Sequence, residues 1–346
     1  MKVLVATSDV PFVEGGHLII AKELVSAINE YGFNAELLLT PQNRFSKIFQ
    51  AYLSTRLIDV EEDGLGGKID KLISFRYPSY ALKHPNHTVW INHRMREYYD
   101  MWENFYPLLG KKAKIKEKLK KILIHKIDNF FLKRVNKIYS QSENIKKRLE
   151  KWGNMKSEVL YPPPPKREYK AGKYGKTIFT VSRLVKHKRV DLIVRALSFV
   201  KDKEIKLIIA GDGPEINNLR ALTKELKIEK RVNFLGKISD KQLIKLYSEA
   251  GAVYYAPYNE DYGFVTVEAF SSGKAIITTE DSGGVAELTQ KSKAGIITKP
   301  TPDNLAEGIN SLFSEKNKLI RLGETGKKWV SQLSWTDTVE KLILTP

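Results

Sequence analysis

Short runs of apolar, often β-branched residues recur along the chain, separated by polar turns that contain glycine or proline. The runs at 2–6 (KVLVA), 177–181 (TIFTV) and 206–210 (KLIIA) are typical of strands that are buried on both faces. The segments between such runs place apolar residues three and four positions apart, which is the spacing of a helix with one buried face. This alternation predicts an α/β protein built from doubly wound parallel sheets.

Four consecutive prolines, Pro162–Pro165, divide the pattern in two. A polar stretch without strand periodicity, KREYKAGKYGK, follows them and indicates a stiff connector. The α/β alternation then starts again near Thr177. A length of 346 residues also suits two domains of ordinary size, so we predict a domain boundary after Pro165.

Composition narrows the possible classes of protein. The apolar fraction of 42% argues against disorder, and no run of about 18 apolar residues indicates a membrane span. The chain has no cysteine, which excludes disulfides and thiolate metal sites, and its first residues do not form a signal peptide. We therefore expect a cytoplasmic protein.

The formal net charge is +18, and the part of it that lies in the first half of the chain is concentrated in one segment. Residues 111–137 contain 11 basic and 2 acidic side chains, and the rest of the first 165 residues is neutral. The apolar residues of this segment have helical spacing, which predicts an amphipathic helix, or two, with a lysine-rich outer face. They are Ile115, Leu119, Ile122, Leu123, Ile127, Phe130 and Phe131.

Three interpretations of the basic segment remain open: a solvated outer helix, a surface for anionic lipid headgroups, and a nucleic-acid surface. Both phenylalanines fall on the apolar stripe and no nucleic-acid-binding motif is present, so we expect no nucleic-acid partner. The lipid or acceptor surface would include Lys116, Lys118, Lys120 and Lys121.

The stretch from Asn259 to Glu287 carries the strongest chemical signal. Two of its acids, Glu260 and Glu268, are separated by seven residues that include an aromatic-glycine pair, and a helix-like segment follows them. A carboxylate in a loop, a glycine that exposes backbone N–H groups and a helix N-terminus together form a site for anions and hydroxyl groups. Acids at the start of a helix are also common for purely structural reasons.

Other candidates follow predicted strands. Arg183 and Lys188 lie between a strand and a helix, where basic side chains can hold a diphosphate or simply occupy a loop. Gly16 stands at a helix start after the first strand, but no GxGxxG is present. His93 follows the strand expected at 88–92, and the carboxyl ends of strands are where α/β sheets bind ligands.

The histidines around that strand allow a second interpretation. His84, His87 and His93 could be zinc ligands, although their spacing matches no common zinc motif.

The motifs taken together resemble the retaining glycosyltransferases of family 4 (glycosyl transferases group 1), which have the GT-B fold. The resemblance is carried by E-x7-E, by EAFSSGKAIIT with the following GGVAE, by VSRL with KRVDLIVRAL, and by VLYPP before the connector. It implies two Rossmann-like domains that face each other across a cleft. Residues 1–165 would bind the acceptor, 166–325 would bind the nucleotide-sugar, and the C-terminal helix within 326–346 would return to the first domain.

The resemblance also implies a role for each matching residue. Glu260 and His93 would act at the transferred sugar. The donor would be held through Gly16, Arg183, Lys188, Ile238, Gly263, Phe264, Val265 and Glu268. Among these, the two basic residues would bind the diphosphate, the loop at Ile238 the base, and Glu268 the ribose diol.

The expected activity is retaining transfer of a hexose from a UDP-, GDP- or dTDP-sugar to a glycan or lipid-linked acceptor. We expect no metal and no other cofactor, because no D-x-D is present and the basic residues can neutralise the diphosphate. A lipid-linked acceptor would place the protein at the inner face of a membrane. Two alternatives are a catalytically silent protein that binds sugar nucleotides, and a GT-B enzyme with a soluble sugar-phosphate acceptor.

Overall fold

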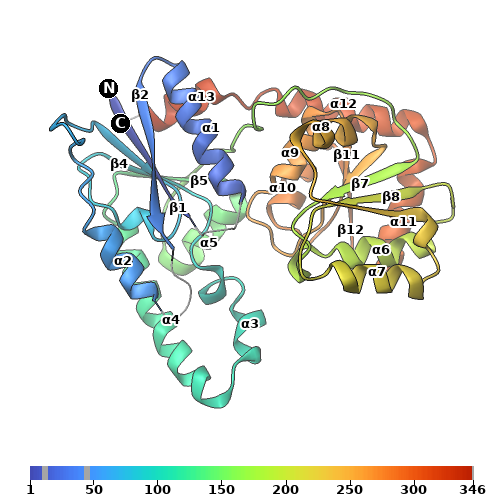
Figure 1. Ribbon diagram of the computed structural model, residues 1–346, viewed down its shortest axis with the longest axis horizontal. Helices are drawn as coiled ribbons and strands as arrows, with labels where there is room; N and C mark the ends of the chain where they lie inside the picture. The colour runs from blue at the N-terminus through green and yellow to red at the C-terminus, as the bar shows by residue number, and fades with distance from the viewer. Residues whose placement is uncertain (10–14, 43–46, 345–346) are drawn as a thin grey trace. The chain divides into compact units, whose positions relative to one another are not determined.

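The computed structural model describes residues 1–9, 15–42 and 47–344, and the chain forms two compact units (Figure 1). Met1–Pro162 and Ser334–Pro346 form the first unit, and Pro163–Leu333 forms the second. The chain therefore leaves the first unit inside the run of four prolines, whose fixed backbone angles suit neither a helix interior nor a central strand. Each unit has its own hydrophobic core.

The first unit contains a six-stranded parallel sheet with the strand order β2-β1-β3-β4-β5-β6. Every position of β3 and β4 is buried, which explains why these strands lack a polar alternation. The strands are β1 (Lys2–Asp9), β2 (Asn34–Pro41), β3 (Lys71–Ser74), β4 (His87–Ile91), β5 (Lys137–Ser140) and β6 (Glu158–Val159).

The helices of the first unit are α1 (Gly16–Glu30), α2 (Ile48–Arg56), α3 (Trp102–Phe105), α4 (Lys111–Leu132), α5 (Glu143–Gly153) and α13 (Trp335–Ile343). Short 3-10 turns, η1 (Ser79–Ala81), η2 (Arg96–Tyr98) and η3 (Tyr106–Leu108), join some of them. The hydroxyl of Ser142 accepts a hydrogen bond from the Ile145 amide at 3.1 Å, so Ser142 is the N-cap of α5.

The second unit repeats the architecture with a parallel sheet in the order β12-β11-β10-β7-β8-β9. Its strands are β7 (Thr177–Val181), β8 (Lys206–Ala210), β9 (Val232–Gly236), β10 (Ala252–Tyr254), β11 (Ala275–Thr279) and β12 (Gly295–Thr298). The predicted α/β class with two doubly wound parallel sheets is confirmed.

The helices of the second unit are α6 (Val190–Phe199), α7 (Ile216–Glu225), α8 (Asp240–Glu249), α9 (Phe264–Ser271), α10 (Gly284–Ser292), α11 (Pro302–Phe313) and α12 (Lys316–Val330). Two 3-10 turns accompany them, η4 (Lys186–Lys188) and η5 (Glu229–Arg231). A β-carbon at Gly323 of α12 would lie 2.0 Å from the carbonyl oxygen of Gly273, so glycine lets these two backbones approach closely.

The last helix, α13, belongs to the first unit although the chain reaches it from the second. The Tyr139 hydroxyl donates a hydrogen bond to the carbonyl oxygen of Lys341 at 3.1 Å, and Trp335 contacts Trp90 edge to face. The hydroxyl of Ser334 accepts a hydrogen bond from the Asp337 amide and caps the N-terminus of α13.

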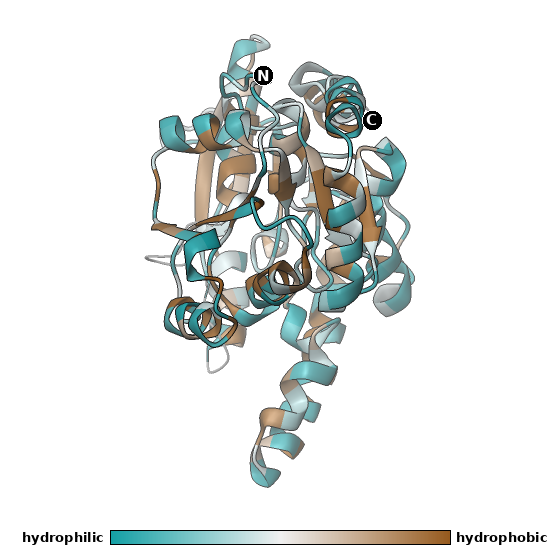
Figure 2. Ribbon diagram, turned by 90° about the vertical axis from the view of Figure 1, so that its right-hand side faces the viewer, coloured by the Kyte–Doolittle hydropathy of each residue, from teal (hydrophilic) through white to brown (hydrophobic). Residues whose placement is uncertain are grey.

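Helix α4 corrects the prediction for the basic segment. The apolar stripe was expected to face inward, but Ile115, Leu119, Ile122, Leu123 and Phe130 are each about half or more exposed. The buried residues of α4 are Ile124, Asp128 and Leu132. Hydrophobic and hydrophilic residues alternate along this helix in Figure 2.

The inner face of α4 is attached to the rest of the first unit largely by hydrogen bonds between polar side chains. The spacing of apolar residues does not indicate such contacts. The carboxylate of Asp128 is fully buried and accepts hydrogen bonds from the hydroxyls of Tyr52, Tyr80 and Tyr99. Burial raises the pKa of Asp128, while nearby Arg94 and the three hydroxyls act in the opposite direction. A buried polar cluster with its partners satisfied fixes the rotation of the helix about its axis.

Candidate functional site

The carboxyl edge of the second sheet brings together two of the residues predicted from the sequence. The ammonium of Lys188, in the turn after β7, lies 2.7 Å from Glu260 Oε2, in the loop after β10. It also donates a hydrogen bond to the Tyr255 hydroxyl at 2.8 Å. Because an ammonium has three N–H donors, this arrangement leaves one for a ligand.

The Lys188–Glu260 pair is largely covered, with side-chain exposures of 14% and 16%. Burial lowers the pKa of Lys188, but the Glu260 carboxylate and Tyr255 more than offset that effect, and the pKa lies above its usual value. Lys188 therefore remains a cation at neutral pH. The site can supply a fixed positive charge beside a hydrogen-bond acceptor.

The loop before α9 supplies backbone N–H groups. Gly263 has φ +88° and is the N-cap of α9, and a β-carbon there would lie 2.6 Å from Val285 Cγ2. Phe264 and Val265 are the first residues of α9, so no carbonyl oxygen four positions earlier in the helix is present to accept hydrogen bonds from their amides. Their amides and the helix dipole favour a negative charge at this end.

The position of Glu260 is fixed by the second glycine turn. Its carbonyl oxygen accepts from the Gly284 amide at 2.8 Å, and its own amide donates to Ser282 at 3.3 Å. Gly284 must be a glycine because a β-carbon there would lie 2.6 Å from the carbonyl oxygen of Asp261. The GGVAE motif therefore holds the loop that carries the carboxylate.

Arg189 and Arg183, two basic residues in the same loop as Lys188, differ in their surroundings. The guanidinium of Arg189 binds both carboxylate oxygens of Asp281, at 2.7 and 2.8 Å, and thereby ties the β7–α6 loop to the end of β11. Arg189 is thus a structural residue. Arg183 is exposed in the same loop, in contrast to the covered Lys188.

The Gly-Asp-Gly-Pro turn after β8 supports the loop that carries Arg183. Gly211 and Gly213 have φ of +113° and +157°, and β-carbons there would overlap the carbonyl oxygens of Ser182 and Leu184. Ile238, predicted to lie near a base, is half-buried in the loop between β9 and α8.

Glu268 lies in a different environment from Glu260. It is 6% exposed, and its carboxylate accepts hydrogen bonds from Arg167, from the Tyr169 hydroxyl at 3.1 Å and from the Tyr247 hydroxyl at 2.9 Å. Sequence reasoning missed Arg167 and Tyr169, which lie in the segment that was interpreted only as a connector.

At the carboxyl edge of the first sheet lie Gly16, at the start of α1, and His93, after β4. The ring of His93 hydrogen-bonds the carbonyl oxygen of Arg94 through Nδ1 at 2.6 Å. Residues 10–14, which precede Gly16, lie outside the described residues.

The same edge carries His17 and Arg76, which the sequence analysis did not select. An Arg76 guanidinium nitrogen lies 3.0 Å from His17 Nδ1, and His17 Nε2 lies 3.0 Å from the carbonyl oxygen of Ser8. Burial and the charge of Arg76 lower the pKa of His17 to about 4, so the ring is neutral at pH 7. The position of Arg76 directly after the β3 run was a signal for selecting it.

The four lysines predicted as a surface patch do not share one environment. Lys116 is exposed, whereas Lys120 pairs with Glu117 at 3.1 Å and Lys121 lies over the Trp102 ring. Lys118 lies over the Tyr106 ring. Most of the predicted patch is therefore turned toward the aromatic residues of α3 and the adjoining turns.

The proposed zinc set does not assemble. The ring of His84 binds the carbonyl oxygens of Ile69 and Asn86, and the ring of His87 binds the Ser74 hydroxyl at 2.7 Å. Within the ranges that the structure describes, no group of three or more histidine or acidic residues could hold a metal ion. None of the helices in those ranges is long and apolar enough to cross a membrane.

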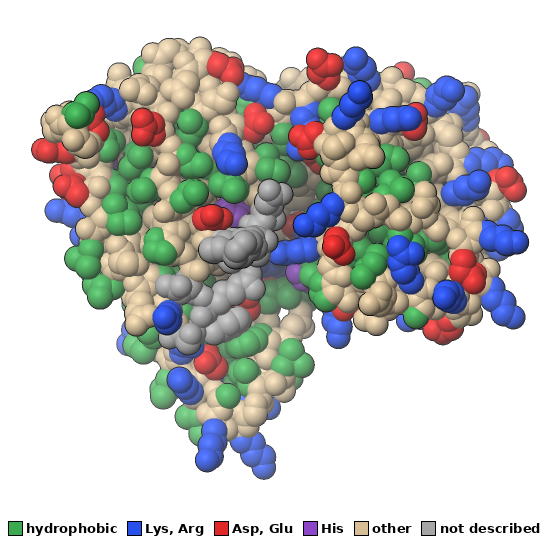
Figure 3. All heavy atoms as spheres, viewed as in Figure 1, with side chains coloured by type: hydrophobic (Ala, Val, Ile, Leu, Met, Phe, Trp, Pro, Cys, Tyr) green, Lys and Arg blue, Asp and Glu red, His purple; other side chains and the backbone are tan. Residues whose placement is uncertain are grey.

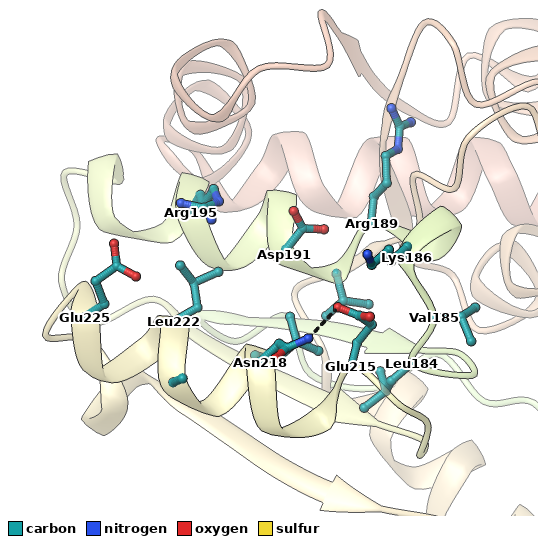
Figure 4. Close-up of a pocket in the computed structure, with 13 residues that line it drawn as sticks. Leu184, Val185, Lys186, Arg189, Asp191, Arg195, Glu215, Asn218, Leu222 and Glu225 are labelled. Carbon is teal, nitrogen blue, oxygen red and sulfur yellow. Dashed lines mark hydrogen bonds between the residues drawn. The ribbon is translucent and has the colours of Figure 1, made fainter. Parts of the chain in front are cut away.

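A cavity of about 460 Å³ lies between α6 and α7 (Figure 4). Its lining mixes both signs of charge, with Lys186 and Arg195 near Asp191, Glu215 and Glu225. Figure 4 shows Arg189 extending away from Asn218 and Glu215. No residue predicted to bind a donor lines this cavity, so its size alone does not make it the candidate site.

Comparison with known proteins finds similarity within the second unit. The family described as "Glycosyl transferases group 1" matches residues 166–329. Among curated relatives, the gpi3 subunit of phosphatidylinositol N-acetylglucosaminyltransferase from Schizosaccharomyces pombe is 30% identical over 189 residues, 54% of this chain and 40% of that protein. The GDP-mannose-dependent alpha-(1-6)-phosphatidylinositol monomannoside mannosyltransferase of Mycobacterium tuberculosis is 28% identical over 51% of this chain and 48% of that protein. The match thus spans less than half the length of these relatives.

Similar solved structures cover nearly the whole chain. Sucrose-phosphate synthase from Thermosynechococcus elongatus has a TM-score of 0.75 at 15% identity and covers 98% of both chains. Anabaena HepE in complex with UDP and glucose has a TM-score of 0.71 at 16% identity and covers 99% of this chain and 98% of the other. At these identities the likeness establishes the fold, and that fold is GT-B. Over residues 166–329, the chain is thus similar to the glycosyl transferases group 1.

Proposed function

We propose that this protein transfers a hexose, with retention of configuration, from a nucleotide-diphosphate sugar to an acceptor. The observation that carries the proposal is the Lys188–Glu260 pair, 2.7 Å apart, beside the N-terminus of α9 and within the family domain. A leaving diphosphate needs a cation, and the sugar needs a hydrogen-bond acceptor. The pair supplies both groups side by side.

Each residue then has a defined task. When the bond between the sugar C1 and the diphosphate oxygen breaks, the electron pair leaves with the diphosphate. Lys188, Arg183 and the amides of Phe264 and Val265 stabilise that negative charge. Glu260 accepts hydrogen bonds from sugar hydroxyls and favours the cationic sugar. The acceptor oxygen forms its bond to C1 on the same face, and its proton passes to the oxygen of the leaving diphosphate.

The remaining assignments rest on the family motif. Glu268 would accept from the ribose diol, the loop at Ile238 would contact the base, and Gly16 and His93 of the first unit would contact the diphosphate and the sugar. Two basic side chains and a helix N-terminus offer enough positive charge for the diphosphate, so we propose catalysis without a metal ion.

A ligand panel tests the donor site. UDP, GDP, dTDP and their glucose and mannose conjugates are added to the protein in EDTA, and thermal unfolding is followed. A ligand at 100 times its dissociation constant adds about 2.7 kcal/mol, a shift of a few degrees for a protein of this size. We expect one nucleotide to raise the melting temperature and Lys188→Met to abolish the shift. No shift with any nucleotide, or a shift and turnover that require Mn²⁺, would contradict the proposal.

For the acceptor we propose a lipid-linked glycan at an anionic membrane surface. The names of both curated relatives given above specify phosphatidylinositol-based molecules. In this chain, α4 exposes Ile115, Leu119 and Ile122 on the side that also carries Lys112, Lys116 and Lys126, all exposed. Residues three, four and seven positions apart share a helix face. Figure 3 shows apolar and basic side chains together where Figure 1 places α3 and α4.

Such a face suits a helix that lies in the headgroup region with its apolar side chains inserted. Of the four lysines selected from the sequence, only Lys116 belongs to this face, and Lys112 and Lys126 take the place of the other three. Each lysine near an anionic surface contributes about 1 kcal/mol to the free energy of membrane binding. Reversing the charge of Lys112, Lys116 and Lys126 should therefore weaken vesicle binding roughly 100-fold or more.

Sedimentation with phosphatidylglycerol-containing vesicles measures this binding. The variants are Lys112→Glu/Lys116→Glu/Lys126→Glu and Ile115→Ser/Leu119→Ser/Ile122→Ser. The matched control, Leu57→Ser/Phe199→Ser, removes two equally exposed apolar side chains elsewhere. If the wild-type protein does not sediment, or the control loses as much binding as the α4 variants, the membrane proposal is wrong and a soluble acceptor becomes the better candidate.

A further inference from the structure

The connector (163–176) is fixed to the second unit along its length, although it contains no helix or strand. The Tyr174 hydroxyl donates a hydrogen bond to the carbonyl oxygen of Gly273 at 2.9 Å, and the buried ammonium of Lys274 donates one to the carbonyl oxygen of Lys173 at 2.8 Å. A β-carbon at Gly172 would lie 2.6 Å from the carbonyl oxygen of Ser248. The connector is therefore a defined surface strap and not a loose tether.

The strap places two side chains on the carboxylate of Glu268. Oε1 accepts from a guanidinium nitrogen of Arg167 and from the Tyr169 hydroxyl, and Oε2 accepts from Tyr247 of α8. A carboxylate has about four acceptor positions, so three donors leave capacity on Oε2. A ligand that uses Glu268 meets a carboxylate whose orientation is already set by the connector.

The guanidinium of Arg167 reaches a second acid. Nε and Nη2 donate to the two carboxylate oxygens of Asp240, at 3.4 and 3.2 Å. Asp240 is the first residue of α8, directly after the loop that carries Ile238. Arg167, 16% exposed, thus bridges from Glu268 to the end of the loop proposed to contact the base.

We propose that Arg167 and Tyr169 are positioning residues of the nucleoside subsite, which orient the Glu268 carboxylate toward the ribose diol. This inference rests on the proposed function, because it takes Glu268 as the ribose acceptor. The donor site would then be formed by the connector as well as by the loops at the carboxyl edge of the sheet.

The electrostatics of Glu268 give the proposal a specific readout. Burial raises the pKa of Glu268, and the positive charge of Arg167 and the two tyrosine hydroxyls oppose this effect. An ionised carboxylate can accept from both ribose hydroxyls, whereas a protonated one presents an O–H donor. Loss of Arg167 should therefore impair ribose recognition, and impair it more as the pH falls.

The experiment compares UDP with 2′-deoxy-UDP, and GDP with 2′-deoxy-GDP, by calorimetric titration of the full chain between pH 6 and 8. The wild-type protein should prefer the ribonucleotide that it binds. Arg167→Gln should reduce that preference tenfold or more at pH 6, with partial recovery toward pH 8. Tyr169→Phe should reduce it less, and Arg167→Lys should retain part of it. Glu168→Gln is the matched control, since that side chain is 88% exposed.

The outcomes separate the two proposals. If the wild-type protein binds UDP, GDP and dTDP no better than buffer, the proposed function fails and the inference fails with it. If it binds only dTDP, which has no 2′-hydroxyl, only the inference is wrong. If Glu268→Gln removes the ribose preference but Arg167→Gln and Tyr169→Phe behave like Glu168→Gln, only the inference is wrong. Equal weakening of ribonucleotide and deoxynucleotide by Arg167→Gln, at every pH, would also overturn it, because that result indicates an anchor for the connector alone. If Arg167→Gln does not fold, Tyr169→Phe and Arg167→Lys decide by the same criterion.

Discussion

Replacing Glu260 by glutamine should strengthen the binding of a free nucleoside diphosphate while it suppresses sugar transfer. In the unliganded site, Glu260 neutralises Lys188 and stands beside the position proposed for the diphosphate. Its carboxylate therefore opposes the binding of an anion that carries no sugar. Glutamine keeps the shape of the side chain and a hydrogen-bond acceptor but removes the negative charge.

The size of the effect follows from the geometry. A phosphate oxygen bound to the third N–H of Lys188 lies about 4.5 Å from Glu260 Oε2, because two N–H bonds of a tetrahedral ammonium are about 109° apart and each hydrogen bond is about 2.8 Å long. Two unit charges at that separation repel by about 0.9 kcal/mol in water and by about 3.7 kcal/mol at an effective dielectric constant of 20. Because the pair is partly covered, we expect affinity for the diphosphate to rise between about 4-fold and 400-fold.

Calorimetric titration with UDP and GDP measures the affinity, and release of nucleotide from the matching sugar conjugate measures transfer. Glu260→Gln should bind the free nucleotide more tightly and lose transfer, whereas Lys188→Met should lose both. If Glu260→Gln weakened free-nucleotide binding as much as Lys188→Met does, Glu260 would not lie beside the diphosphate, and the reasoning would be refuted.

Two further predictions concern stability. Gly263→Ala places a β-carbon against Val285 on a residue with a left-handed backbone, and should lower the free energy of unfolding, measured with urea, by about 1–3 kcal/mol. Gly64→Ala, where a β-carbon meets nothing within 4 Å, should leave the stability unchanged. Equal effects of the two substitutions would contradict the strain argument. Burial, with a smaller effect of His84, lowers the pKa of His87 to about 3. Below pH 6.5 the unfolded chain therefore binds a proton at His87 that the folded chain does not bind. The free energy of unfolding falls as the pH decreases, because protonation favours the unfolded chain. His87→Gln should therefore reduce the loss of stability between pH 7 and pH 5 by about 2 kcal/mol, and an unchanged loss would show that His87 is not buried as a neutral ring.

The sequence predicted the strands of the second unit better than any other feature. β7 and β8 begin and end where the apolar runs at 177–181 and 206–210 do, because strands in the middle of a parallel sheet are covered on both faces and are therefore mostly apolar. Helix α2 was missed, since the 41–80 region shows no clear helical period and its buried residues include Tyr52 and Thr55.

The orientation of α4 could not be obtained from periodicity. Spacing determines which residues share a face, but not which face is covered. Here the covered face is selected by contacts between distant residues, such as the three tyrosine hydroxyls on Asp128. For the same reason, the contact between Arg167 and Glu268, 101 residues apart, leaves no mark in any local pattern.

The return of α13 to the first unit has a consequence for synthesis of the protein. Pro163–Leu333 is one uninterrupted segment, so the second unit has all its residues once that segment has been made. The first unit lacks α13, with the contacts of Trp335 and Lys341, until residues 335–343 leave the ribosome. The half that is translated first is therefore the half that is completed last, and a chain that ends early at Leu333 would keep a complete second unit while leaving Trp90 and Tyr139 without their C-terminal partners.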